Sequence, residues 1–82
     1  MSSVHSREYQ EFLRSLRRAR EDAQLTQVEV ALRLRKPQSY VSKSEAGERR
    51  VDVIELLEFL HVYGANPAAF VQALKYPKRY PR

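Results

Sequence analysis

The segment KPQSYVSKSEAGERR, from Lys36 to Arg50, is rich in hydrogen-bonding side chains and poor in apolar ones. Read as a helix with about 100° per residue, it has one face of amide, hydroxyl and ammonium groups, formed by Gln38, Ser39, Ser42 and Lys43. Val41 and Ser44 lie on the opposite face, with Tyr40 and Glu45 at its borders. The polar face therefore has donors and acceptors but no carboxylate.

Such a face suits the major groove of double-stranded DNA, which admits one helix and presents base edges as patterns of donors and acceptors. Gln pairs with adenine through two hydrogen bonds, Lys donates to guanine, and Ser acts as donor or acceptor. The outer face of any solvated helix has a similar composition, so an ordinary polar surface is the alternative.

The charge is concentrated around this segment. Fifteen Lys and Arg against ten Asp and Glu give a net charge of +5. Residues 33–50 contain six basic and two acidic residues, whereas residues 51–74 contain three acidic residues and no basic one. A surface that is charged only for solubility accounts for the net charge but not for the clustering, which indicates an anionic partner.

Other chemistry has little support in the sequence. The chain has no cysteine, which excludes disulfides and thiolate metal sites. His5 and His61 have no carboxylate partner at a ligand spacing, and no glycine-rich loop or nucleophile motif is present. We therefore expect no enzymatic activity, no metal and no cofactor. No stretch is apolar enough to span a membrane or to act as a signal peptide, so we expect a cytoplasmic protein.

The elements that position the polar face are predicted to be helices, because apolar residues recur with helical spacing and never alternate as in a half-buried strand. We predict an all-α fold of five helices in one domain, residues 1–75. The first helix spans roughly residues 6–23. Residues 76–82 form a basic tail with two prolines, predicted to be extended and either solubilising or a phosphate-seeking arm.

Capping residues indicate where the second and fourth helices begin. Thr26 followed by Glu29, and Asp52 followed by Glu55, have the spacing of a capping box. Gly64 is expected to end the fourth helix in the left-handed conformation. We expect Val53, Ile54, Leu56, Leu57, Leu60 and Val62 to form the apolar filling of the fourth helix.

The fifth helix, which begins with Asn66 as cap and Pro67 in the first turn, is apolar almost all round. So small a domain cannot easily surround it, so a dimer interface at Phe70, Val71 and Leu74 is expected. Alternatively, Phe70 and Leu74 complete the monomer core and Val71 is exposed.

The stretch LTQVEVALRLRKPQSYVSKSEAGERR resembles the phage-repressor and Cro-like (XRE-type) helix-turn-helix family, and the likeness extends roughly from Arg17 to Gly64. It is carried by the Thr-Gln opening, Ala31, Leu34, the Gln-Ser start of the third helix, Val41 and the Glu-x-Gly that closes it. The resemblance implies a compact lambda-repressor-like domain, in which the second and third helices form the helix-turn-helix.

The resemblance also implies roles for individual residues. The base-contacting positions are Gln38, Ser39, Ser42 and Lys43. Gln27 matches a glutamine that binds phosphate and supports the third helix. Beyond the resemblance, we expect Lys36, Tyr40, Arg49 and Arg50 to contact the DNA backbone as well. Arg20 and Glu45 match a partly buried ion pair between the first and third helices.

The chain departs from the family pattern at the turn and beneath the third helix. Arg35 stands where glycine is usual, which predicts a left-handed residue that costs about 1 to 2 kcal/mol. Lys36 and Ser44 replace residues that are commonly apolar, and Gln24 stands where a glycine often ends the first helix. These changes bear on turn geometry and stability more than on function.

The sequence therefore predicts a sequence-specific, double-stranded DNA-binding transcriptional regulator, a repressor that binds a pseudo-palindromic operator as a homodimer. The alternative is a protein-interaction module or an antitoxin whose main partner is another protein, such as a toxin, bound through the acidic fourth helix and the apolar fifth helix.

Overall fold

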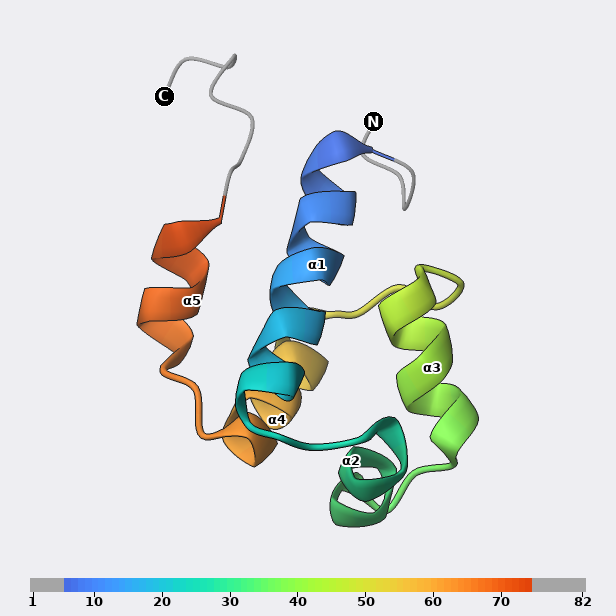
Figure 1. The fold of residues 1–82 in the computed structure, drawn as a ribbon. Helices are drawn as coiled ribbons and strands as arrows, with labels where there is room; N and C mark the ends of the chain where they lie inside the picture. Colours follow the sequence, from blue (N-terminus) through green and yellow to red (C-terminus); the bar gives the residue numbers. More distant parts are fainter. Residues whose placement is uncertain (1–5, 75–82) are drawn as a thin grey trace, which may run out of the picture.

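The computed structural model describes residues 6–74, which form five α-helices and no strand. The helices are α1 (Arg7–Asp22), α2 (Gln27–Leu34), α3 (Gln38–Ala46), α4 (Val53–Tyr63) and α5 (Pro67–Ala73) (Figure 1). The prediction of an all-α fold with five helices is therefore confirmed. The predicted basic tail, residues 76–82, lies outside the described residues, and the limits of the domain stay a prediction.

The predicted capping boxes are present. The Thr26 hydroxyl accepts the N–H of Glu29 at 3.1 Å, and the Glu29 carboxylate accepts the N–H of Thr26 at 2.8 Å. Asp52 and Glu55 repeat this arrangement at the start of α4, which ends at Gly64 with φ 67°. Because each box satisfies N–H groups that a helix start leaves unpaired, α2 and α4 begin at defined residues.

The core lies where α1, α2, α3 and α4 meet. Its fully buried apolar side chains come from all four helices: Leu16, Val30, Val41, Phe59 and Leu60. Full burial of each such side chain contributes about 1.5 to 3 kcal/mol. The α3 helix is therefore held against the rest of the domain by one face, whose centre is Val41.

The α5 helix flanks α1 on the side away from α3 (Figure 1). The ring of Phe70 meets the ring of Phe12 edge-on, with 6.2 Å between the centroids. Within residues 6–74, no helix combines the length and the apolar content that crossing a bilayer requires.

The apolar residues of α4 divide between the core and the surface. Phe59 and Leu60 are buried, whereas Val53, Ile54 and Leu57 are exposed. The apolar side chains of α4 point in most directions, but the described residues cover this helix on one side only.

Candidate functional site

The α2 and α3 helices are joined by a tight turn in which Arg35 is left-handed, with φ 58° and ψ 44°. The N–H of Lys36 donates to the carbonyl of Ala31 at 3.0 Å, which closes the end of α2. Pro37 precedes α3 as its N-cap and forms no side-chain capping bond. Arg35 therefore adopts the left-handed backbone conformation that glycine usually adopts at such a turn.

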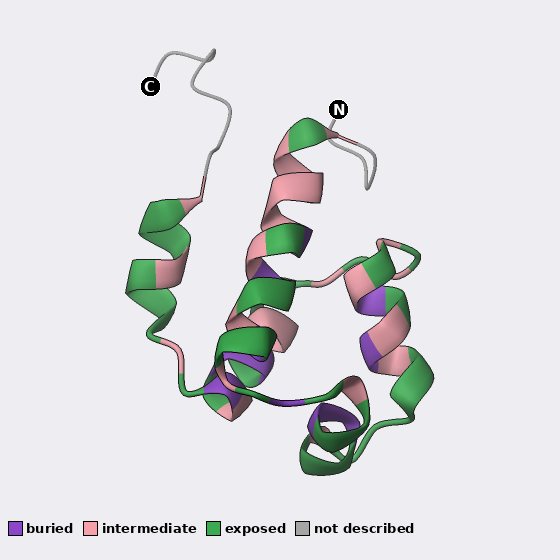
Figure 2. Ribbon diagram, in the orientation of Figure 1, coloured by how far each residue is buried: buried purple, intermediate pink, exposed green. Residues whose placement is uncertain are grey.

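The α3 helix has one buried face and one open face (Figure 2). Val41 and Ser44 are buried, and the Ser44 hydroxyl donates to the carbonyl of Tyr40 at 2.7 Å. A buried hydroxyl satisfied within its own helix is tolerated at low cost. This bond explains how serine replaces an apolar residue beneath α3.

The four side chains predicted to contact bases share the open face of α3. Gln38, Ser39 and Lys43 are exposed, and Ser42 is half-buried, with its hydroxyl 3.4 Å from the carbonyl of Ser39. The single acid of α3, Glu45, has a side chain that is only 6% exposed. The open face therefore has hydrogen-bonding groups and one cation, and no anion.

Glu45 is buried because two elements bind it. Nε of Arg20 donates to one carboxylate oxygen at 2.6 Å, and Nη2 donates to the other at 3.1 Å. A third guanidinium N–H donates to the carbonyl of Leu25 at 2.8 Å. Gln27 adds a hydrogen bond from its amide to Glu45 at 3.0 Å. The ion pair between Arg20 and Glu45 thus joins α1 to α3, and Gln27 joins the start of α2 to the same carboxylate.

Arg49, in the loop after α3, is held by α4 rather than free. Its guanidinium donates two hydrogen bonds to the carboxylate of Glu55, and it lies 4.2 Å from the centroid of the Tyr40 ring. The hydrogen bonds from Arg49 and from the N–H of Asp52 lower the pKa of Glu55 from 4.5 to about 2. The ring of Tyr40 in turn stacks on Phe59 at 5.8 Å. Arg49 therefore positions Tyr40 against the core.

The phenol of Tyr40 keeps its proton in this environment. Burial is the main cause that raises the pKa of Tyr40 above 10.0, and the nearby carboxylate of Glu55 is the next. A neutral phenol is a hydrogen-bond donor. Nζ of Lys36 lies 5.3 Å from the centre of the same ring.

Arg50 is exposed and lies over the ring of Tyr9, with Cζ 4.8 Å from the ring centroid. The hydroxyl of Tyr9 accepts the N–H of Val51 at 3.0 Å. The α1 helix therefore fixes the loop that carries Arg50. The sequence pattern indicates neither Tyr9 nor Glu55 as part of the site, because their partners are 42 and 6 residues away.

The residues predicted to form a dimer interface lie on or just after α5. Phe70 is half-buried against Phe12, Leu74 is half-buried, and Val71 is 52% exposed. Whether a second copy covers them stays a prediction. In the part of the chain that the structure describes, no group of three or more His, Asp or Glu residues has the geometry of a metal site.

Comparisons with known proteins show to which family this architecture belongs. A family model described as "Helix-turn-helix domain" matches residues 11–73. Among solved structures, the chain is similar to an XRE-family like protein from Pseudomonas syringae pv. tomato str. DC3000, with 46% sequence identity and a TM-score of 0.79. That alignment covers 84% of each chain. A search of curated proteins gives no match.

Proposed function

Since the chain belongs to the helix-turn-helix family and to its XRE-like DNA-binding regulators, we propose that it reads the major groove with α3 and represses transcription at its site. The observation that carries this proposal is the open face of α3, which has Gln38, Ser39, Ser42 and Lys43 and no carboxylate. A major groove about 12 Å wide accommodates such a helix. The known relationship supports DNA as the partner, and the open face supports α3 as the reader.

The four side chains of the open face can contact bases in different ways. Gln38, at the first position of α3, is exposed and can form two hydrogen bonds with adenine. Lys43 can donate to guanine, and Ser39 and Ser42 can act in either sense. Each good bidentate pair contributes about 1 to 3 kcal/mol of discrimination against the wrong base.

The backbone contacts come from the residues around α3. Gln27 uses one amide N–H for Glu45 and keeps the other for a phosphate. The neutral phenol of Tyr40 and the exposed charges of Lys36 and Arg50 are further donors. Arg49 contacts a phosphate only with the N–H groups that Glu55 leaves unused. These contacts set the register of the protein on the duplex.

We further propose that two copies bind one operator. Two-fold related recognition helices lie about 34 Å apart on one side of B-DNA and select a roughly palindromic sequence. The sequence of the operator then mirrors the symmetry of the dimer.

Selection from a random duplex pool at near-physiological salt tests the proposal. We expect enrichment of a two-fold symmetric site. Gln38→Ala should relax base preference at one position of each half-site, whereas Arg50→Ala should weaken binding to all sequences alike. Arg50 is the better backbone probe than Arg49, because loss of Arg49 also removes the ion pair with Glu55.

Two results would count against this assignment. Equal, non-selective losses from Gln38→Ala and Arg50→Ala would mean that α3 does not read bases. Failure to enrich any sequence, with a folded protein, would favour the protein-interaction module or antitoxin, in which another protein is the main partner. Repression itself requires a reporter gene behind the selected site, whose expression should fall when the protein is present.

A further inference from the structure

Most of the large apolar side chains that stand exposed lie on α2 and α4, outside the open face of α3. Of the six large apolar side chains that stand exposed in residues 6–74, five lie on α2 and α4: Val28, Leu32, Val53, Ile54 and Leu57. The sixth is Val71 of α5. A cluster of exposed apolar side chains with polar edges is typical of a protein-interaction surface.

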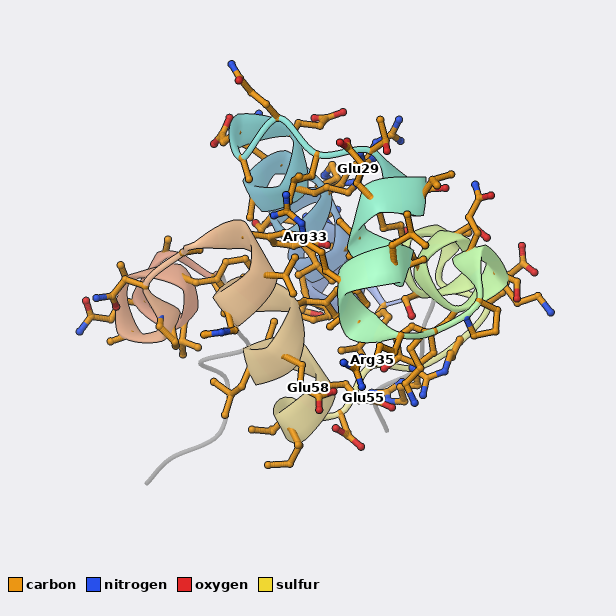
Figure 3. The ribbon with its side chains drawn as sticks, turned by 90° about the horizontal axis from the view of Figure 1, so that it is seen from below. Glu29, Arg33, Arg35, Glu55 and Glu58 are labelled. Carbon is orange, nitrogen blue, oxygen red and sulfur yellow. The ribbon has the colours of Figure 1, made fainter. Side chains whose placement is uncertain are left out.

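Two of these side chains border a groove of about 450 Å³ between α2 and α4. Ile54 is 65% exposed and Leu57 is 42% exposed, and Leu34 and Val62 complete the apolar lining. Figure 3, which views the molecule from below, shows α2 between α3 and α4. The α2–α4 groove therefore lies beside the recognition helix and leaves its open face free.

The edges of the α2–α4 groove have opposite charges. On the side of α2 the groove is lined by the basic residues Arg33 and Lys36, and on the side of α4 by the acid Glu58 together with His61. Neither Arg33 nor Glu58 forms an ion pair with any other described residue. The groove thus has an apolar floor, a basic edge and an acidic edge.

We propose that the α2–α4 groove is the surface on which a second copy of this chain docks. In a two-fold interface the same patch faces itself in reverse, so each copy's basic edge meets the acidic edge of the other. Arg33 of each copy then pairs with Glu58 of the other, and Ile54 and Leu57 are covered. A patch with edges of one sign would repel its copy, so this pattern favours self-association over other partners.

This surface differs from the interface expected from the sequence, which lies on α5. There, Phe70 is already packed on Phe12, and Val71 alone is a large exposed apolar residue. The α2–α4 groove has two large exposed apolar side chains, Ile54 and Leu57, and its two sides have complementary charges. The inference concerns self-association without DNA, so it does not rest on the proposed function and fails separately from it.

A charge-swap experiment tests the pairing between copies. Sedimentation equilibrium of the full chain without DNA should show a monomer–dimer equilibrium. Arg33→Glu or Glu58→Arg alone should each raise the dimer Kd by about tenfold or more, because both contacts become repulsive. An equimolar mixture of the two variants should form heterodimers again, because both contacts between unlike chains are attractive.

The apolar floor has its own test and a matched control. Leu57→Asp should weaken the dimer at least as much as the charge swaps, because it places an unpaired carboxylate in the covered region. Val71→Asp makes the same type of change on α5 and should leave the Kd unchanged. Both positions are exposed in the monomer, so circular dichroism should show unchanged helicity.

Three outcomes would overturn the proposal. The first is a wild-type chain that stays monomeric at every concentration. The second is a dimer that Val71→Asp abolishes and Leu57→Asp does not affect, which would place the interface on α5. The third is a mixture of the two charge-swap variants that associates no better than either variant alone.

Discussion

At the scale of single residues, Glu45 is the point where three elements meet. Its carboxylate accepts hydrogen bonds from Arg20 of α1 and Gln27 of α2 while it belongs to α3. The hydrogen bonds that Arg20 donates to Glu45 are the main cause that raises the pKa of the Arg20 guanidinium above its ordinary value. The orientation of α3 therefore depends on an ion pair that lies largely inside the protein.

We expect Glu45→Gln to lower the free energy of unfolding by about 3 to 5 kcal/mol, because it leaves the Arg20 charge buried without a counter-charge. Urea unfolding followed by circular dichroism measures the change. Glu48→Gln is the control, since Glu48 is an exposed acid two residues after α3, and its loss should change stability by less than about 0.5 kcal/mol.

The double variant Arg20→Met with Glu45→Leu distinguishes the cost of an uncompensated buried charge from the cost of altered packing. Apolar side chains of similar size remove both charges together, so the double variant should be more stable than Glu45→Gln. If the single and double variants lose the same stability, the cost lies in packing and the argument from an uncompensated charge is wrong.

At the scale of elements, the helix boundaries follow from local signals and were predictable. Thr26 with Glu29, Asp52 with Glu55, and Gly64 act within four residues of each helix end, so the chain order is enough to locate them. The two faces of α3 were predictable for the same reason, since its helical spacing separates Val41 and Ser44 from the open face.

The packing of α4 and the partners of Arg49 were not predictable in this way. The α4 helix has apolar residues on most sides, so its pattern does not tell that Phe59 is buried and Ile54 exposed. That choice depends on which side α1, α2 and α3 cover. Arg49 reaches Glu55 across a loop, and no spacing rule applies to such a pair. The phosphate contact of Arg49 stays a prediction, and only the three-dimensional structure shows that its side chain is already paired with Glu55.

The turns that end α1 and α2 store backbone strain that glycine would relieve. Arg35 and Gln24 have φ values of 58° and 59°, in the region where a Cβ atom is unfavourable. We expect Arg35→Gly and Gln24→Gly each to raise the free energy of unfolding by about 0.5 to 1 kcal/mol, after the greater entropy of glycine in the unfolded chain is subtracted. Thermal and urea unfolding measure both.

Gly64→Ala is the reciprocal control for these turns. Gly64 has φ 67°, and a Cβ added there would meet no atom within 4 Å. Its substitution should therefore cost about 1 kcal/mol from backbone strain alone. If Arg35→Gly and Gly64→Ala are both less stable than the wild type, the Arg35 side chain contributes more to the free energy of unfolding than its strained backbone costs.

At the scale of the whole molecule, the charge is divided between regions. Residues 33–50 have six basic and two acidic side chains, and residues 51–74 have three acidic and none basic. The structure places the first set on α2, on α3 and in the loops that flank α3, and it places the three acids, Asp52, Glu55 and Glu58, at the cap or on α4, where Glu55 pairs with Arg49. The α5 helix, on the other side of α1, has no charged residue (Figure 1). Lys36, Lys43 and Arg50 form no ion pair with another described residue, so a polyanion that approaches this molecule is attracted to the side of α3.

This division predicts how DNA binding depends on salt. Each phosphate neutralised by the protein contributes about −0.9 to the slope of log affinity against log salt concentration. Arg50→Ala should make that slope less negative by about 0.9, because the phosphate contact proposed for Arg50 is lost. Gln38→Ala should lower the affinity for the selected operator without changing the slope, since the role proposed for Gln38 is to contact a base and not a phosphate. Arg18→Ala is the matched control, because it removes the same charge from the side of α1 that faces α5. Fluorescence anisotropy titrations at several salt concentrations measure all four proteins. An equal change of slope for Arg18→Ala and Arg50→Ala would show that net charge, and not a contact beside α3, governs the salt dependence.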